Sequence, residues 1–351
     1  MRVSEEAQVG DRATPATISD VADLAGVSTA TVSRVLAGIG SPKPATAAAV
    51  HRAVIELGYR PSAVARSLRM RRTQTLGLIV TDIQNPFFPE LVQAADVAAR
   101  ARGYSILLGS AAYDERRAMH YLDLMVDRRV DGLLIASSQL SEESWDWVVR
   151  SPVPVVVVNA EPAGRALTVI TSDNSAGMGI AIGHLVEMGH RAIAYIQGPP
   201  LYTATGARVE GFRHACGVAG LDPARTPVLA GDGLYEGGVS AGERLLAEGL
   251  RVTAVVCYND LTAIGVMRAL REAGVHVPNE VSVVGCDDIA AASWVSPTLT
   301  TLVQAKTEMG RLAVERMLTL LKDPTQAGTR QTVRLPMSFQ VRESIGPPAT
   351  R

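Results

Sequence analysis

Polar side chains stand shortly after three apolar runs in the second half of the sequence. Arg208 lies beyond AIAYIQGPP, Asn259 follows AVVCY, and Asp287 follows VSVVGC. A carboxylate accepts hydrogen bonds from two hydroxyl groups, a guanidinium donates several in a fixed fork, and an amide does both. These residue types therefore predict a site that holds a small polar ligand by hydrogen bonds.

Aromatic rings accompany these polar residues. Phe87 and Phe88 end the segment DIQNPFF, which follows the apolar run TLGLIV, and Tyr202 and Trp294 lie near the polar residues in the sequence. Ring faces can pack on a sugar or a base, so all four are candidate ligand contacts. The neighbouring Asp260 is interpreted instead as the cap of its own helix.

The elements that must position these residues are predicted by the rhythm of the sequence. From Thr75 onwards, short β-rich runs alternate with helical stretches that begin near Pro86, Asp114 and Ser141, and the same rhythm resumes after Asp173. Continuous apolar strands that alternate with helices imply parallel sheets covered on both faces. The units are too many for one sheet. We therefore expect two similar α/β lobes, with a ligand cleft at the carboxyl ends of their strands.

A different pattern precedes the lobes, in the stretch ISDVADLAGVSTATVSRVL. Apolar residues fall at i, i+3, i+4 and i+7 from Ile18, which is one face of a first helix. Gly26 suits the end of that helix, and Ser28 is placed to cap a second helix that buries Val32 and Val35. The stretch predicts a helix-turn-helix, and an ordinary αα-hairpin is the alternative.

The exposed face of the second helix carries Thr29, Ala30, Ser33 and Arg34. In a helix-turn-helix this face lies in the major groove of DNA. Arg34 can donate two hydrogen bonds to O6 and N7 of guanine, and the short side chains offer methyl groups to thymine. A third helix is expected to begin at Pro44, which suits a first helical position, and to end at Gly58.

Charge is divided unevenly along the 351 residues. Residues 1–73 hold ten Lys and Arg against six Asp and Glu, a formal +4, whereas the whole chain carries −1, so the remainder carries −5. A compact basic head on an acidic body is typical of a protein in which the head alone binds phosphates.

The segments TISDVADLAGVSTATVSRVL and ELGYRPSAVARSLRMRRTQTLGLIV resemble the LacI/GalR family of bacterial transcription regulators. The resemblance extends from about residue 17 to 343. It implies a small all-α helix-turn-helix head and a doubly wound α/β domain of two lobes, similar to periplasmic binding proteins. The implied divisions are a disordered tail (1–16), the head (17–61), a hinge helix or linker (62–73), an effector-binding and dimerisation domain (74–343) and a tail (344–351). The N-lobe is expected at about 74–172 and 302–330, and the C-lobe at about 173–301 and 331–343.

The same resemblance implies a repressor of transcription that binds a pseudo-palindromic operator in double-stranded DNA as a homodimer. An effector between the lobes, of the sugar, sugar phosphate or nucleoside class, would control the affinity for DNA. The hinge would become helical when two copies pair over the minor groove, with Leu68 wedged between base pairs and Ala65 small enough for the helices to approach. The remaining expected DNA contacts are Ser28, Thr31 and Tyr59.

The chain departs from the family pattern at several positions. Gly233 stands where relatives often carry an aromatic residue, and Cys286 stands where Phe or Tyr is frequent. Both changes remove ring surface from the pocket and favour a larger or less sugar-like effector. In the head, a frequent Asn is replaced by Ala37, a basic residue by Ala47 and another Asn by Ser62, which predicts weaker non-specific binding to DNA.

Other classes of protein fit the sequence less well. A solute-binding protein would share the two lobes, but it needs an export signal, which MRVSEEAQVGDRATPA does not resemble, and it has no use for the head. Motifs of dinucleotide folds, P-loops and zinc proteases do not occur, so we expect no enzyme, catalytic residue or cofactor. The three cysteines lack metal-binding spacing, and no apolar run reaches the ~18 residues of a membrane span. We expect a cytoplasmic protein with buried, reduced thiols and no metal site.

Overall fold

The computed structural model describes residues 16–349 apart from 37, 39, 60–71, 137–139, 201, 250 and 327. The chain divides into two compact units, Met1–Thr73 and Gln74–Arg351. The head belongs to the first unit and both lobes belong to the second. Each unit has a buried apolar core of its own.

The described residues of the head form three helices, α1 (Ile18–Ala25), α2 (Thr29–Leu36) and α3 (Pro44–Glu56). The turn between α1 and α2 is made at Gly26, whose φ of 65° lies in the left-handed region that favours glycine. The Ser28 hydroxyl accepts a hydrogen bond from the backbone N–H of Thr31 at 3.2 Å, which caps α2 as predicted. The core that the helices enclose consists of Val21, Ala22, Val32, Val35, Val50 and Ala53. The predicted helices are confirmed.

The first lobe is built on a six-stranded parallel sheet with the order β11-β5-β4-β3-β1-β2. Its strands are β1 (Thr75–Val80), β2 (Ser105–Ser110), β3 (Gly132–Ala136), β4 (Val155–Val158), β5 (Thr168–Ser172) and β11 (Gln331–Leu335). Its helices are α5 (Phe87–Arg100), α6 (Glu115–Asp127), α7 (Glu142–Val149) and α12 (Lys306–Lys322).

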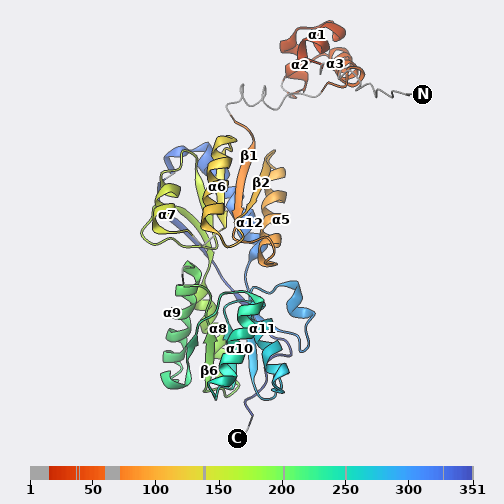
Figure 1. The fold of residues 1–351 in the computed structure, drawn as a ribbon. Coiled ribbons are helices and arrows are strands. Elements are labelled where there is room, and N and C mark those ends of the chain that lie inside the picture. Colours follow the sequence, from red (N-terminus) through yellow and green to blue (C-terminus); the bar gives the residue numbers. More distant parts are fainter. Residues whose placement is uncertain are drawn as a thin grey trace, which may run out of the picture. The chain divides into compact units, whose positions relative to one another are not determined.

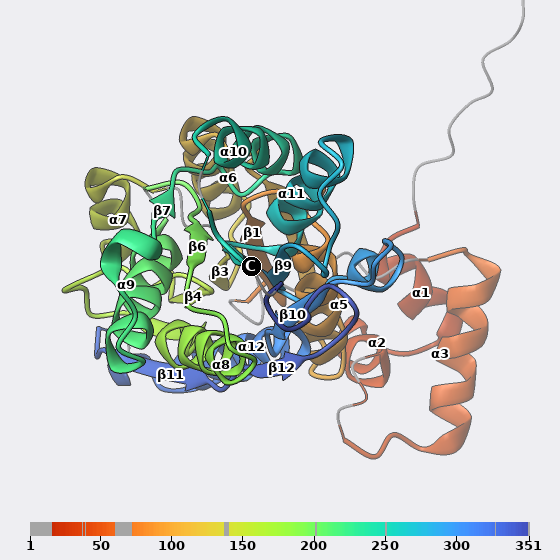
Figure 2. The ribbon, with the colours of Figure 1, turned by 90° about the horizontal axis from the view of Figure 1, so that it is seen from below.

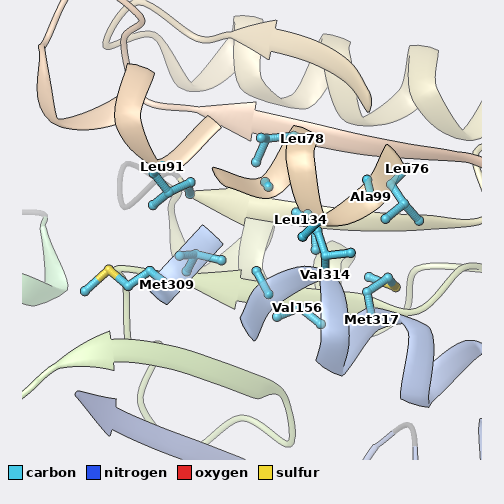
Figure 3. Packing of buried hydrophobic residues seen from close by; sticks show 14 of the residues in the cluster. Leu76, Leu78, Leu91, Ala99, Leu134, Val156, Met309, Val314 and Met317 are labelled. Carbon is cyan, nitrogen blue, oxygen red and sulfur yellow. The ribbon is translucent and has the colours of Figure 1, made fainter. Parts of the chain in front are cut away.

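Continuous apolar strands are needed here because both faces of the sheet are covered. In β1, Leu78 packs in the core with α5 and α12, whereas its neighbour Ile79 packs in the core with α6 and α7. Figure 3 shows the first of these cores, with labelled side chains Leu76, Leu78, Leu91, Ala99, Leu134, Val156, Met309, Val314 and Met317.

The second lobe repeats this plan with the strand order β12-β10-β9-β8-β6-β7. Its strands are β6 (Ile193–Ile196), β7 (Val228–Leu229), β8 (Ala254–Cys257), β9 (Ser282–Cys286), β10 (Thr300–Val303) and β12 (Ser338–Gln340), of which β12 is antiparallel to β10. Its helices are α8 (Asn174–Glu187), α9 (Thr203–Val218), α10 (Tyr235–Ala247) and α11 (Asp260–Glu272). Figure 2 shows α10 and α11 on one side of this sheet and α8 on the other. The three cysteines are buried free thiols in this lobe.

The chain crosses between the lobes three times, and two expected boundaries require correction. The strand β11 pairs in parallel with β5, so residues 331–335 belong to the first lobe and not to the second. The strand β10 pairs with β9, so residues 302–303 belong to the second lobe. The crossings therefore follow Ser172, Val303 and Leu335. The sequence TVRLPMSFQVRES predicted late strands, but nothing in a short edge strand specifies which of two similar sheets it joins.

Figure 1 shows the two lobes of the second unit joined by these crossing segments, with the carboxyl ends of their strands turned toward the junction. Such an arrangement places the loops after the strands of both lobes beside one another. Among the described residues, no helix is both long enough and apolar enough to cross a lipid bilayer.

Candidate ligand-binding cleft and DNA-reading helix

A cleft lies at the junction of the two lobes, with about 450 Å³ of space between atoms when the open solvent at its mouth is included. Six of the seven predicted ligand contacts line it: Phe87, Phe88, Tyr202, Arg208, Asn259 and Asp287. The other lining residues are Thr81, Asn85, Tyr113, Asn159, Asp232, Gly233, Tyr258 and Gln304. Both lobes therefore contribute side chains, as expected for residues that follow parallel strands.

Arg208 is the buried cation of the cleft, with 2% of its surface exposed. Its Nε donates to Asn174 Oδ1 at 2.8 Å, and its Nη1 donates to the carbonyl oxygen of Tyr258. Burial lowers the pKa of the Arg208 guanidinium, but the acidic groups around it, Asp287 among them, outweigh this effect and leave the pKa above its usual value. The guanidinium is therefore charged. Among the described residues, no protein oxygen accepts a hydrogen bond from its Nη2.

Asp287 lies within the same buried site and is 5% exposed. Its Oδ1 accepts a hydrogen bond from Gln304 Nε2 at 2.5 Å, and Gln304 Oε1 in turn accepts from the Ser172 hydroxyl at 2.6 Å. Burial raises the pKa of Asp287, and Arg208 opposes this rise. A carboxylate has room for further hydrogen bonds, so Asp287 can still accept from a ligand.

The turn that carries Asp287 has an unusual backbone. The φ angles of Asp287 and Asp288 are 124° and 51°, which side-chain-bearing residues rarely adopt. Lys306 holds this turn, because its Nζ donates to the carbonyl oxygens of Asp287 at 2.8 Å and Asp288 at 2.7 Å. The same Nζ lies 3.1 Å from Glu90 Oε1 of α5. A buried cation of the first lobe thus fixes a ligand-site turn of the second.

Asn259 lines the cleft, but most of its hydrogen-bonding capacity is used by the protein. Its Oδ1 accepts from the N–H and the hydroxyl of Thr262 at 2.9 and 2.8 Å, and its Nδ2 donates to Gly233 O at 2.8 Å. Asn259, and not Asp260, is therefore the cap of α11, which corrects the expectation for Asp260. One N–H of the Asn259 amide is left for a ligand.

Asp260 instead joins the loop after β9 to the strand β10 inside the second lobe. It is fully buried, and its carboxylate accepts from Ile289 N–H at 2.8 Å and from the Thr301 hydroxyl at 2.5 Å. Burial raises the pKa of Asp260 to about 7, and the nearby Asp287 adds to this rise. Its protonated form is therefore favoured more than in an exposed aspartic acid.

The aromatic part of the cleft comes from both lobes. Phe87 and Phe88 begin α5 with ring centroids 5.1 Å apart in an edge-to-face arrangement. The Phe87 N–H donates to Asn85 Oδ1 at 3.0 Å, which orients the start of the helix. Tyr202 and Tyr258 line the cleft from the second lobe, with ring centroids 6.5 Å apart.

Several residues that line the cleft were absent from the sequence prediction, although their positions after strands could have indicated them. Tyr113, Asn159 and Tyr258 follow β2, β4 and β8, so the rule that found Asp287 applies to them equally. Burial, and then the charge of Asp82, raises the pKa of Tyr113 to about 12, so its hydroxyl is neutral. The Oδ1 of Asn159 is buried without a hydrogen-bond partner among the described residues, and it is thus an acceptor available to a ligand.

Trp294 does not belong to the cleft, which corrects the sequence prediction. It is 78% exposed and borders a separate surface groove with Tyr235 and His276. The reason is local, because the chain forms a short 3₁₀ turn (Ala290–Ser293) after Asp288 and leaves the strand end. Proximity to Asp287 in sequence was therefore misleading.

In the head, the residues predicted to contact DNA divide into two groups. Ser28, Thr29, Ala30 and Arg34 are exposed, and Thr31 and Ser33 are half-buried. Tyr59 is also half-buried, packs against the core of the head, and donates its N–H to Val54 O. Ala65 and Leu68 lie outside the residues that the structure describes.

Comparison with known proteins agrees with both parts of this architecture. Residues 17–62 match the model of bacterial regulatory proteins of the lacI family, and residues 182–345 match a periplasmic binding protein-like domain. The ribose operon repressor of Escherichia coli K12 is 39% identical over 311 residues, which cover 88% of this chain and 94% of the relative. The transcriptional repressor PurR of Haemophilus influenzae is 36% identical, with coverage of 94% and 98%.

Solved structures lead to the same conclusion. The lac repressor dimer bound to operator and the anti-inducer ONPF superposes with a TM-score of 0.85 at 28% identity and covers 94% of this chain and 99% of the repressor chain. A LacI family regulator from Enterococcus faecium with bound ribose gives a TM-score of 0.70 at 28% identity, with coverage of 78% and 99%. The fold and the site define a DNA-binding transcriptional regulator with an effector-binding domain. The chain belongs to the lacI family of bacterial regulatory proteins, and the relatives from Escherichia coli and Haemophilus influenzae are both repressors.

Proposed function

We propose that the chain represses transcription by binding a pseudo-palindromic operator as a homodimer, under the control of a small ligand in the cleft. The exposed side chains of Thr29, Ala30 and Arg34 support the DNA contact, because they lie on the helix that reads base edges in helix-turn-helix proteins. Ser33 lies beside them. Two heads would occupy half-sites about 34–36 Å apart. Since its target is DNA, we place the regulator in the cytoplasm.

The connection between head and body, residues 62–73, would transmit the ligand signal. The segment 62–70 is too short to be a stable helix alone, whereas two copies could support one another over the minor groove. Leu68 is the proposed wedge between base pairs, and Ala65 the point of close approach. A coupling of about 1–3 kcal/mol is enough to change operator affinity about 5- to 150-fold.

We propose a neutral, polyhydroxylated ligand such as a monosaccharide. Among the residues that line the cleft, Arg208 is the only cation, and two carboxylates, Asp232 and Asp287, line it as well. A phosphorylated ligand would bring two further negative charges without a second cation to bind them, which disfavours sugar phosphates. Asn159 and Asp287 offer acceptors to hydroxyl groups. Ribose is the first candidate, because a related repressor is named for the ribose operon and a related regulator was solved with ribose.

The observation that carries this proposal is the buried pair of Arg208 and Asp287, which retains hydrogen-bonding capacity toward the cleft. Calorimetric titration with ribose and ribose 5-phosphate tests it. We expect ribose to bind, the phosphate ester to bind much more weakly, and Arg208→Met and Asp287→Asn each to weaken ribose about 10- to 100-fold, as for loss of a hydrogen bond to a charged group.

The exposed Arg225 provides the matched control, because Arg225→Met removes the same charge on the surface of the second lobe. It should leave ribose affinity unchanged. Equal binding of ribose by the wild-type chain and both cleft variants would contradict the site, and tight binding of the phosphate ester would contradict the ligand class.

A further inference from the structure

Tyr258 holds a fixed position on the second-lobe side of the cleft. Its N–H donates to Ile196 O at 2.8 Å, and its carbonyl oxygen accepts from Arg208 Nη1. The residue is 9% exposed and lines the cleft. Because the N–H and the carbonyl oxygen of Tyr258 are both hydrogen-bonded, the backbone determines where the Tyr258 side chain enters the cleft.

Two glycines make room for this ring. A methyl group added at Gly198 would lie 2.7 Å from ring carbons of Tyr258, and one added at Gly233 would lie 3.3 Å from them. Favourable carbon–carbon contacts need about 3.5–4.0 Å, so a larger residue at either position displaces the ring. Gly233 is where the sequence led us to expect lost ring surface and a larger ligand. Tyr258, which follows β8, places a ring beside Gly233.

The same ring supports the cation of the cleft. The Arg208 guanidinium carbon lies 4.7 Å from the centroid of the Tyr258 ring, within the range of a cation–π contact. Its Nε is fixed at the same time by Asn174. The guanidinium thus lies over the ring while protein oxygens hold its Nε and Nη1, and Nη2 is the nitrogen left to donate to a ligand.

We propose that Tyr258 determines the ligand specificity of the cleft: its ring excludes ligands larger than a single sugar and orients Arg208 toward a ligand of that size. This inference rests on the proposed function, a neutral polyhydroxylated effector, and adds a size limit to it. A nucleoside carries the same pentose as ribose but needs space for its base. The ring of Tyr258 fills space on the side of the cleft where Arg208 lies.

Calorimetric titration of the full-length chain with D-ribose and with adenosine tests the proposal. The wild-type chain and Tyr258→Phe, which keeps the ring, should favour ribose over adenosine by about tenfold or more. In Tyr258→Ala the affinity for ribose should fall about tenfold, and the ratio of the two affinities should move toward adenosine by about tenfold or more.

A second variant displaces the ring without deleting it. Gly198→Ala places a methyl group against the Tyr258 ring and should move the affinity ratio in the same direction as Tyr258→Ala. Gly206→Ala is the matched control, because a methyl group there meets nothing within 4 Å, and it should behave as wild type. Circular dichroism melting of each variant verifies that it folds. If Tyr258→Ala does not fold, Gly198→Ala decides.

The possible outcomes separate this inference from the function on which it rests. If Gly198→Ala and any folded Tyr258→Ala bind ribose with an unchanged preference over adenosine, the role of Tyr258 is overturned and the proposed function stands. If neither probe binds to the wild-type chain or to any variant, the proposed ligand class is overturned together with the size limit.

Discussion

Two buried carboxyl groups of the second lobe, Asp260 and Asp287, have pKa values above the usual value of an exposed aspartic acid. The pKa of Asp260 is about 7, far above its usual 3.8, because burial and Asp287 disfavour its ionised form. Between these two values the folded state binds more protons than the unfolded chain does. The contribution of Asp260 therefore stabilises the fold more as the pH falls through 7, and is lost as the pH rises.

Replacement of this carboxyl by an amide should remove the effect. The free energy of unfolding of wild type relative to Asp260→Asn should increase when the pH is lowered from 8 to 6, with a slope of at most about 1.4 kcal/mol per pH unit. Urea unfolding of both proteins at several pH values measures this difference. A difference that does not vary with pH would show that Asp260 is ionised throughout.

At the same scale, Arg34 is proposed to read a base. It is exposed on α2, and its Nε donates only a long hydrogen bond of 3.4 Å to Ala30 O. Arg34→Ala should relax sequence preference at one position per half-site by about 1–3 kcal/mol. Selection from a randomised palindromic DNA library at fixed salt measures this. Arg52→Ala, an exposed arginine on α3, is the control and should keep the preference. An unaltered consensus for Arg34→Ala would refute the assignment.

At the scale of elements, the start of α12 ties the lobes together through Lys306. The ammonium group is buried and bonds to two carbonyl oxygens of the Asp287–Asp288 turn, while Glu90 of α5 balances its charge. A ligand that contacts Asp287 in one lobe and Phe87 in the other would therefore act on elements that are already joined.

Lys306→Met should break this connection without replacing any residue that lines the cleft. Loss of buried hydrogen bonds from a charged group costs about 1.5–3 kcal/mol, and the melting temperature of the body should fall by about 3–10 °C. Ribose should also bind more weakly, because the Asp287 turn loses its support. Lys322→Met, at the exposed end of the same helix, should change neither quantity. Unchanged ribose affinity for a destabilised Lys306→Met would limit Lys306 to a role in folding.

Prediction of these elements from sequence succeeded where one local pattern decides the outcome. The helices of the head follow from spacing and from a turn at Gly26, and the parallel strands follow from continuous apolar runs. Arg208 and Asp287 were found because strand ends in such folds face a common edge. Failure had two causes. The sheet that β11 joins is decided by packing at long range. The cap at Asn259 and the exposed position of Trp294 are local, but they depend on the residue at which a helix or a turn begins, which residue types alone do not fix.

Tyr258 illustrates the same limit inside the site. It stands beside Asn259, which the sequence did indicate, yet its importance depends on Gly198 and Gly233. These glycines are far from it in sequence, and only their proximity in the fold reveals that they accommodate its ring. The polar residues that line the cleft, such as Arg208 and Asp287, could be predicted, whereas the shape of the cleft could not.

At the scale of the whole molecule, the proposed binding of two operator half-sites requires a dimer. In the first lobe, the edge strand β2 exposes Leu107 and Leu108 (37% and 40% exposed), and Val97 of α5 is 54% exposed. Apolar surface of this kind often marks an interface. Leu108→Asp should convert the protein to monomers at micromolar concentration, as measured by analytical ultracentrifugation. The exposed Val218 on α9 is the control, and Val218→Asp should remain dimeric. A dimeric Leu108→Asp would place the interface elsewhere.

The central claim is that ligand binding in the cleft determines the affinity of the head for DNA. Its most direct measurement is operator affinity of the full-length chain, with DNA selected from a palindromic library, with and without saturating ribose at fixed salt. We predict that ribose changes the affinity about 5- to 150-fold, and that Arg208→Met binds the operator but no longer responds. An operator affinity that is the same with and without bound ribose, or a response that survives in Arg208→Met, would contradict the account.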